Sequence, residues 1–382
     1  MIKSLALQNF KCFDDVSIPL KPLTLITGLN AAGKSTSLQT LLLLAQTYRA
    51  QTRHLNELRL NGTLCALGTP GDVINQRRGG NSFALGFSID QGFALWRLAV
   101  HPQDRRAVVM QDIEAGSVPP DSDQGTKQRT IDAAVSALEQ LIYLSAARQV
   151  ETEVFPSPQG ADRFIGNVGV VGQFAAYWFD QEKDNEVSSS RCLNESNTGT
   201  TLRHQLNVWA SQLFPDGEMN AVNLAPTSLL RLELRTGLLA QWSRPSNIGY
   251  GMTYAFPILV AGLIASSGST IIIDSPEAHL HPAAQAAMGM FLAKMSASGV
   301  QVLIETHSDH VMDGVRIAVR DGVLSKEAAA FHYFDRTADG VTISSPIIDA
   351  EGKLSEWPRG FFDQHRRSAA KLIRPKPSER SQ

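Results

Sequence analysis

Apolar and polar residues alternate in the first part of the chain, at residues 2–10, 16–20 and 23–27. A period of two is typical of β-strands with one buried face. From residue 34 to about residue 49 the leucines recur at helical spacing instead, so a helix follows the third strand. Alternation returns, with turn residues between the segments, at 83–89, 94–100 and 107–110. These later segments predict an antiparallel lobe.

After residue 250 the hydrophobic period changes repeatedly between helix and strand. Helical spacing is found at 251–264, 283–295 and 309–319, and strand-like segments are found at 270–274, 300–305 and 330–334. Alternating β and α units are typical of a largely parallel sheet that binds ligands at the carboxyl ends of its strands. The sequence therefore predicts an α/β fold with a mostly parallel core sheet.

The middle of the chain is interpreted as a helical and loop insertion. It has a turn-rich stretch at 117–127 and helical patterns near 130–142 and 202–214. No heptad run is long enough to predict a coiled coil. We expect a large unit at 1–335, divided into 1–115, the insertion 116–245 and 246–335, and then a small C-terminal domain with a basic tail at 336–382.

Composition is that of an ordinary globular protein, with 43% hydrophobic and 19% charged residues. No apolar run reaches the length of a membrane span, and the start of the chain lacks the features of a signal peptide, so we expect no membrane association and a cytoplasmic location. The 3 cysteines are too widely spaced for a disulfide framework or a paired-cysteine metal site. A net charge of −2 gives no overall attraction to nucleic acid, although a local basic groove could still bind DNA.

The most specific motif is Gly28-Leu-Asn-Ala-Ala-Gly33-Lys34-Ser35, which lies between a predicted strand and a predicted helix. In such a loop the glycines let backbone N–H groups point at phosphates, and the helix start adds partial positive charge. Lys34 would reach the outer phosphates and the Ser35 hydroxyl would bind Mg²⁺. The predicted phosphate-binding residues are Asn30, Ala31, Ala32, Gly33, Lys34, Ser35 and Thr36.

A second Mg²⁺ ligand is expected at the carboxyl end of a buried strand, where Asp274 follows three isoleucines. The alternative is that Asp274 only caps the next turn. The following strand ends in the polar run Glu305-Thr-His-Ser-Asp-His310. Within that run, His307 is the candidate for contact with a γ-phosphate or with the attacking water.

Three motifs together resemble those of ABC-class ATPases of the SMC, RecF and OLD branch. They are residues 28–36, Asp274-Ser-Pro-Glu-Ala-His-Leu-His-Pro282 and Glu305-Thr-His-Ser308. Within that branch the chain is most similar to AAA-type ATPases with a C-terminal domain of unknown function, many of them antiphage proteins such as Septu-like ATPase subunits. Segments 143–148, 247–253 and 356–363 also fit this family, so the resemblance covers most of the chain and implies an ABC-ATPase head at 1–335.

The resemblance implies a composite site in which two subunits pair head to tail and each ATP contacts the loop of one subunit and a signature segment of the other. Residues Asn247 to Thr253 occupy the place of the signature. Gly249 and Gly251 would permit close backbone approach, and Thr253 would offer a hydroxyl to the γ-phosphate. Without the resemblance, the same segment is a glycine turn before a core helix.

One position departs from the ABC-class pattern. Ser275 stands where these enzymes usually have a glutamate that polarises the attacking water, and a serine hydroxyl is a poor base at neutral pH. Either Glu277 is the base or hydrolysis is slow and ATP binding is the signal. We predict slow hydrolysis, with Ser275, Glu277 and His307 as the candidate catalytic residues.

Several further residues have open interpretations. Gln76 is a candidate for the Mg²⁺-sensing glutamine of the superfamily. Arg148 could reach phosphate or a partner, or could be a structural, salt-bridged arginine. The histidines could form a zinc site, but interface and phosphate-sensing roles explain them better; they are His279, His281, His307 and His310.

The predicted function is an ATP-controlled switch in antiphage defence, with ATP and Mg²⁺ as cofactors. It would form a homodimer or a higher even oligomer and control a separately encoded effector, such as an HNH-type or other nuclease. The alternative is a RecF-like or SMC-like ATPase of DNA repair or chromosomes that binds duplex DNA. A transporter engine would need an LSGGQ signature, which the sequence lacks, and a free-standing NTPase is the remaining possibility.

Overall fold

The computed structural model describes residues 1–50, 56–117, 124–148, 153–193, 199–237, 239–338, 340–358 and 371–373. The alternating N-terminal segments form an antiparallel sheet of order β2-β1-β4-β5-β6. Its strands are β1 (Ile2–Phe10), β2 (Phe13–Pro19), β4 (Ser82–Ile89), β5 (Gly92–Val100) and β6 (Val108–Ser117). The predicted antiparallel lobe is therefore confirmed.

The core sheet has the order β14-β13-β3-β12-β11-β7. Its strands are β3 (Leu23–Gly28), β7 (Ile142–Leu144), β11 (Thr270–Asp274), β12 (Gln301–Glu305), β13 (Ala329–Thr337) and β14 (Gly340–Ser344). Neighbouring strands are parallel except for the antiparallel pair of β13 and β14. The mostly parallel core sheet is confirmed as well.

The helices of the described residues are α1 (Lys34–Arg49), α2 (Pro70–Val73), α3 (Gln124–Glu139), α4 (Ala175–Glu182), α5 (Leu202–Leu213), α6 (Tyr250–Ile264), α7 (Pro282–Ala297) and α8 (Asp309–Arg320). From α6 to β13 the helices alternate with the core strands, as the sequence predicts for the region after residue 250. Short 3₁₀ turns occur at η1 (Gly160–Asp162), η2 (Pro245–Asn247) and η3 (Lys326–Ala328).

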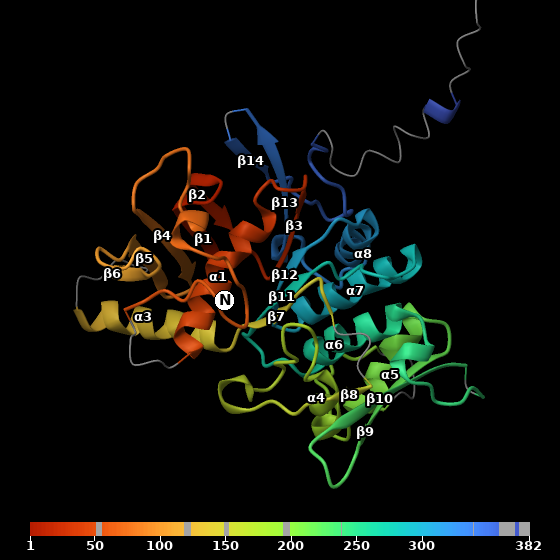
Figure 1. Cartoon of the computed structure of the whole chain (residues 1–382). Coiled ribbons are helices and arrows are strands. Elements are labelled where there is room, and N and C mark those ends of the chain that lie inside the picture. Colours follow the sequence, from red (N-terminus) through yellow and green to blue (C-terminus); the bar gives the residue numbers. More distant parts are fainter. Residues whose placement is uncertain are drawn as a thin grey trace, which may run out of the picture.

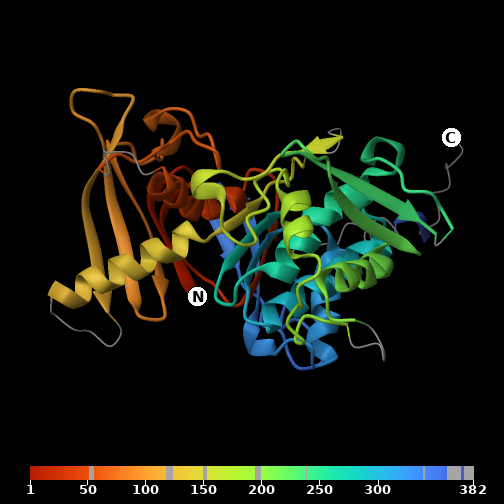
Figure 2. The same ribbon diagram turned by 90° about the horizontal axis from the view of Figure 1, so that it is seen from below.

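The core sheet separates two hydrophobic clusters, because alternate residues of a strand face opposite sides. On β11, Ile271 and Ile273 join one cluster and Ile272 joins the other, and β12 repeats this division. The first cluster includes residues of α6, α7 and α8, and the second includes α1 and the antiparallel sheet. Figures 1 and 2 show the core sheet between the antiparallel sheet and the α4–β10 region, which lie at opposite ends of the molecule.

The predicted helical insertion at 116–245 is only partly helical. Besides α4 and α5 it contains a small sheet of order β8-β10-β9, formed by β8 (Val154–Phe155), β9 (Gly217–Asn223) and β10 (Leu230–Thr236). Buried residues alternate along β9 and β10, which is the ordinary signal of a half-buried strand. The interpretation of this segment as helices and loops was therefore wrong in part.

The predicted boundary at residue 116 also fails. The helix predicted to reach residue 142 ends at Glu139, and β7 then pairs in parallel with β11 as the edge of the core sheet. Helix α3 packs on the antiparallel sheet, with Ala134 and Leu138 buried in the same cluster as β4 and β5 (Figure 2). Three residues are too few to show a strand period, so only pairing with β11 defines β7.

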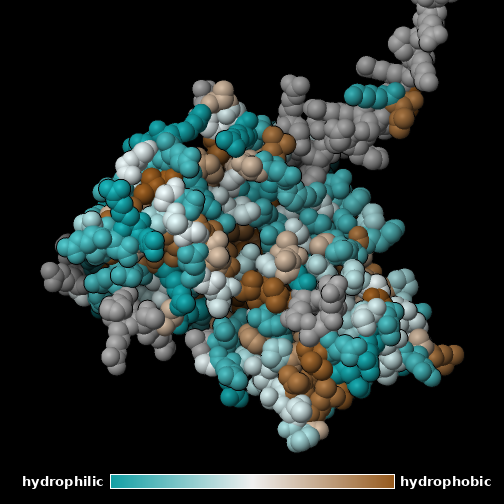
Figure 3. All heavy atoms as spheres, in the orientation of Figure 1, coloured by the Kyte–Doolittle hydropathy of each residue, from teal (hydrophilic) through white to brown (hydrophobic). Residues whose placement is uncertain are grey.

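The predicted boundary at residue 335 falls inside β13. Pairing of β13 with β3 and β14 extends the core sheet to residue 344. Residues 359–370 and 374–382, with much of the predicted basic tail, lie outside the described residues. No helix in the described ranges is long and apolar enough to cross a membrane. The face shown in Figure 3 is mostly hydrophilic, and its apolar areas are separated from one another.

Candidate nucleotide site

Strand β3 leads into α1 through the predicted phosphate loop, and two glycines define its path. Gly28 has φ 134, and a Cβ atom there would lie 2.0 Å from the carbonyl oxygen of Phe334. Gly33 has φ 98 and is the N-cap of α1, with no side chain accepting a hydrogen bond from the helix start. The first N–H groups of α1 therefore have no side-chain cap, which suits an anion at this helix end.

Lys34 and Ser35 begin α1 and already face polar groups of the site. Lys34 is only 4% exposed, and its Nζ donates to the carbonyl oxygens of Gly28 at 3.1 Å and Leu29 at 2.8 Å. Burial lowers the pKa of Lys34, while the Glu305 and Asp274 carboxylates oppose that change. The Ser35 hydroxyl donates to Glu305 Oε1 at 2.9 Å.

A cavity of about 490 Å³ lies in front of the loop. It is lined by Lys11, Cys12, Asn30, Ala31, Gly33, Lys34, Ser35, Thr36, Asp274, Glu305 and His307. Of the predicted loop residues, Ala32 alone is absent from this lining, and it is fully buried. Gln76 instead lines a neighbouring cavity of about 510 Å³, which shares Lys11 and Cys12 with the first.

Two carboxylates meet at the carboxyl edge of the core sheet. Asp274 ends β11 and pairs in parallel register with Glu305, which ends β12. Glu305 is 6% exposed, and burial raises its pKa to about 7, with a further contribution from the Asp274 charge. The sequence prediction missed Glu305 as a site residue, although its place at the end of an apolar strand matched that of Asp274.

Ser275 and Glu277 lie outside this cavity lining and have other hydrogen-bond partners. Ser275 has φ 51, and its hydroxyl donates to Asp274 Oδ1 at 2.9 Å. Glu277 Oε2 accepts from the Thr306 hydroxyl at 2.7 Å, and Oε1 accepts from the His307 N–H at 2.9 Å. The geometry therefore gives Glu277 a role in holding the loop after β12, and it does not favour the predicted role of base.

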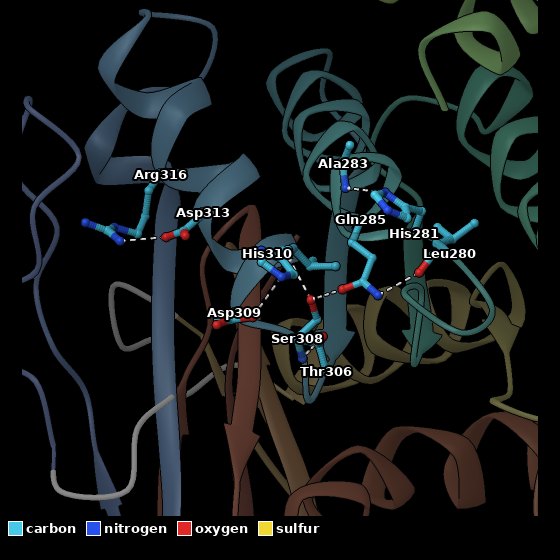
Figure 4. A network of polar contacts seen from close by, with 11 residues as sticks. Leu280, His281, Ala283, Gln285, Thr306, Ser308, Asp309, His310, Asp313 and Arg316 are labelled. Atoms are coloured by element: carbon cyan, nitrogen blue, oxygen red, sulfur yellow. Dashed lines mark hydrogen bonds and ion pairs between the residues drawn. The ribbon is translucent and has the colours of Figure 1, made fainter. Parts of the chain in front are cut away.

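His307, whose backbone N–H donates to Glu277, lines the cavity. It is exposed, and partial burial together with the Lys34 charge lowers its pKa. A second set of contacts holds the next residue: Ser308 donates to Gln285 on α7, and Gln285 donates to the Leu280 carbonyl oxygen at 2.9 Å (Figure 4). The loop that carries His307 is thus held by both the β11–α7 segment and α7.

Arg148 holds the loop after β11 through hydrogen bonds to its backbone. It is 5% exposed, and its guanidinium donates to the carbonyl oxygens of Asp274 at 2.6 Å and Ser275 at 3.1 Å. It also lies over the Tyr254 ring, with its Cζ atom 5.5 Å from the ring centroid. Burial lowers its pKa to about 10. Of the two interpretations of Arg148, the structural one therefore fits, with backbone carbonyls as the partners.

The predicted signature segment lies at the start of α6 and contributes nothing to the cavity lining. Asn247 and Gly249 are exposed, whereas Gly251 is buried, and a Cβ on Gly251 would lie 2.8 Å from the His279 carbonyl oxygen. Thr253 is 3% exposed. Its hydroxyl thus points into the fold, contrary to the expectation that it is offered to a nucleotide.

The four histidines near the site have separate partners. His281 caps α7, with its Nδ1 accepting from the Ala283 N–H at 3.4 Å, and His310 lies 3.7 Å from Asp309 (Figure 4). His279 packs on Tyr254, with ring centroids 4.6 Å apart. Within the described ranges no group of three or more histidine, cysteine, aspartate or glutamate residues could hold a metal ion, so the zinc alternative has no support.

Family models match three parts of the chain. The model described as "AAA ATPase domain" matches residues 1–83, and the one described as "AAA domain, putative AbiEii toxin, Type IV TA system" matches residues 197–313. A third, described as "Protein of unknown function (DUF3696)", matches residues 324–372. This order is that of an AAA-type ATPase followed by a domain of unknown function, as the resemblance implied.

The individual proteins similar to this chain include an OLD nuclease and two SMC heads. An OLD nuclease of Thermus scotoductus is 49% identical over 41 residues, which are 11% of this chain and only 8% of that protein. An SMC head bound to the C-winged helix domain of ScpA has a TM-score of 0.55 at 14% identity, covering 91% of this chain and 98% of that one. An SMC head with an extended coiled coil, bound to the C-terminal domain of ScpA from Pyrococcus furiosus, has a TM-score of 0.55 at 12% identity over 98% and 99% of the two chains.

The fold is that of an SMC head. The family models match domains of AAA-type ATPases, and the likeness to the SMC heads concerns the fold. The site also fits a nucleoside triphosphate with Mg²⁺, because the start of α1 has no side-chain cap and the Lys34 ammonium lies at the loop, where it donates to backbone carbonyl oxygens. Lys34 would hold the outer phosphates, and Ser35 and Asp274 would hold Mg²⁺, which supplies positive charge to the phosphate oxygens.

Because the pKa of Glu305 is raised, the stability of the nucleotide-free protein should depend on pH. This pKa is raised from 4.5 to about 7, so between these values the folded protein keeps a proton that the unfolded chain has released. This stabilisation is complete below pH 4.5 and is lost as the pH rises to about 7. The free energy of unfolding of the parent should fall by about 3 kcal/mol over this interval, relative to Glu305→Gln. Urea denaturation at each pH measures it, and a difference that does not change with pH contradicts the prediction.

Proposed function

We propose that the chain binds ATP with Mg²⁺ in the cavity before α1 and hydrolyses it slowly to ADP and phosphate. The observation that carries this proposal is the convergence of Lys34, Ser35 and Asp274 from separate elements onto one cavity. A lysine and an uncapped helix start provide the positive charge that a triphosphate needs, and a hydroxyl and a carboxylate are suitable oxygen ligands for Mg²⁺. Calorimetric titration with ATP and Mg²⁺ tests binding, and phosphate release tests turnover.

We further propose that two copies pair head to tail around ATP. Gly249 supports this arrangement because, among the described residues, no atom beyond its chain neighbours lies within 4 Å of a Cβ built there, and its φ of −55 suits any residue. A glycine that the fold does not require is consistent with close approach by another molecule. Leu29 in the phosphate loop and Tyr250 beside Gly249 are large exposed apolar side chains, at 48% and 43%, which suits burial in an interface.

Gly249→Gln is expected to separate dimer formation from folding. Gly249 is exposed and a Cβ there has no neighbour within 4 Å among the described residues, so the melting temperature of the monomer should not change. ATP-dependent dimerisation should weaken at least about tenfold, because the side chain fills the space that a partner needs. Sedimentation with and without ATP and Mg²⁺ measures the association, and calorimetry on the same variant checks that ATP still binds. A dimer as stable as that of the parent contradicts the proposed interface.

The proposed biological role is a nucleotide-controlled switch in antiphage defence. The effector that it controls is separately encoded and is a nuclease of the HNH type or another type. Similarity to a toxin-system AAA model and to an OLD nuclease supports a defence setting. The SMC-head fold supports the alternative, a repair or chromosome ATPase that binds duplex DNA. Co-purification with neighbouring gene products, with and without ATP, tests the first role, and salt-dependent binding to duplex DNA tests the second.

A further inference from the structure

Hydrolysis at this site requires a group that orients the attacking water, and Ser275 is not that group. Its hydroxyl donates to Asp274 Oδ1 at 2.9 Å, and Ser275 is not among the residues that line the cavity. Its N–H donates to the Glu305 carbonyl oxygen at 2.8 Å, which fixes the loop in this conformation. A catalytic carboxylate, if present, must come from another position.

Glu277 also follows β11, but its carboxylate already has hydrogen-bond partners. Each of its two carboxylate oxygens accepts a hydrogen bond from the loop after β12, one from the Thr306 hydroxyl and one from the His307 N–H. Turning Glu277 toward the cavity would break both bonds and release His307. Glu277 is therefore a positioning residue for that loop.

Glu305 fulfils the geometric requirements. It ends β12 in direct register with Asp274 on β11, and paired residues of parallel strands project from the same face of a sheet. Besides Asp274 it is the carboxylate among the residues that line the cavity, which also include Lys34 and His307. Its side chain accepts a hydrogen bond from the Ser35 hydroxyl, at 2.9 Å.

We propose that Glu305 is the catalytic carboxylate of this ATPase, supplied by the strand next to the one that normally carries it; the inference rests on the proposed hydrolysis of ATP. Glu305 accepts a hydrogen bond from the attacking water and aligns its oxygen with the γ-phosphorus. The water oxygen bonds to phosphorus as the bond from phosphorus to the bridging oxygen breaks. ADP and phosphate form, and one proton passes to solvent.

The Ser35 contact fits this assignment. In the nucleotide-free structure Ser35 donates its hydroxyl to Glu305, which holds the carboxylate in place. In the proposed function Mg²⁺ would take a lone pair of the Ser35 oxygen, which leaves the hydroxyl proton to donate to Glu305 Oε1. The second carboxylate oxygen, Oε2, is then the one that accepts a hydrogen bond from water.

The test compares carboxylate-to-amide variants in the full-length protein. Glu305→Gln should bind ATP with Mg²⁺ within about threefold of the parent, because Lys34, Ser35 and Asp274 are kept, whereas kcat should fall at least about 100-fold. Glu277→Gln should lose clearly less, since one amide oxygen can still accept a bond from the loop. Asp309→Asn removes an exposed carboxylate four residues along the chain and should keep the turnover of the parent. Glu305→Asp should restore part of the lost rate.

The nucleotide that remains bound gives a second readout. After incubation with ATP and Mg²⁺ and removal of free nucleotide, Glu305→Gln should retain ATP, whereas the parent should retain ADP. Parental turnover in Glu305→Gln overturns the assignment and leaves the proposed function intact, as does a loss of ATP binding equal to the loss of rate. A parent that binds ATP without any turnover overturns the assignment and the proposed hydrolysis together.

Discussion

Lys34→Met is expected to remove nearly all ATP binding. Methionine keeps the length and the apolar stem of lysine, so α1 should begin as before, but the ammonium that now donates to Gly28 and Leu29 is lost. Two charge-assisted hydrogen bonds to phosphate together contribute at least about 3 kcal/mol, which corresponds to a roughly 100-fold rise in Kd. Calorimetric titration with a non-hydrolysable ATP analogue and Mg²⁺ measures it.

The matched control for this experiment is Lys326→Met. Lys326 is exposed and lies 3.8 Å from Glu327, just before β13, which begins beside the start of β3, whereas the phosphate loop follows the end of β3. Its replacement should leave the Kd for ATP unchanged. If Lys34→Met bound the analogue as tightly as Lys326→Met, the cavity in front of α1 would not be the triphosphate site.

The fold was predictable wherever a local period extended over enough residues. The segment from β3 through the glycine loop to α1 and the alternation of α6, β11, α7, β12 and α8 follow from hydrophobic spacing alone. The strand β7 did not, because its three residues become a strand only by pairing with β11. Buried and partly buried positions alternate along β9 and β10, so the sequence contains the pattern that predicts these two strands.

The site was predictable to the same extent. Motif spacing identified Lys34, Ser35, Asp274 and His307, which the fold brings to one cavity. The role of Glu305 depends on its register with Asp274, and two strands 31 positions apart along the chain show no register in the sequence. Likewise, the direction in which the Glu277 carboxylate points depends on contacts with another loop, which its spacing from Asp274 does not show.

The crossing of α7 and α8 determines where the His307 loop lies, and two glycines make the crossing possible. A Cβ on Gly314 would lie 2.1 Å from the carbonyl oxygen of Ala286, and a Cβ on Gly289 would lie 2.2 Å from that of Val311. These atoms are backbone, so neither neighbour can move aside by changing a rotamer. The helices touch at their backbones, and an added methyl group must force them apart.

Gly314→Ala should therefore destabilise the protein although alanine is the better helix former. Forcing a methyl group into backbone contact costs about 3 kcal/mol, which exceeds the gain in helix propensity of about 1 kcal/mol. Gly71→Ala is the matched control, because its Cβ would approach only the Thr69 hydroxyl, at 3.8 Å. Urea denaturation should show a lower free energy of unfolding for Gly314→Ala alone, by about 2 kcal/mol.

The same substitution should also slow ATP turnover, because Ser308, which follows His307, caps the start of α8 and donates a hydrogen bond to Gln285 on α7. A wider crossing moves the start of α8 away from α7 and with it the loop that faces the cavity. We expect kcat to fall at least about tenfold at a temperature where Gly314→Ala is fully folded, with a smaller change in the Kd for ATP, since Lys34 and Ser35 are on α1. Equal turnover in Gly314→Ala and Gly71→Ala would show that the crossing serves stability alone.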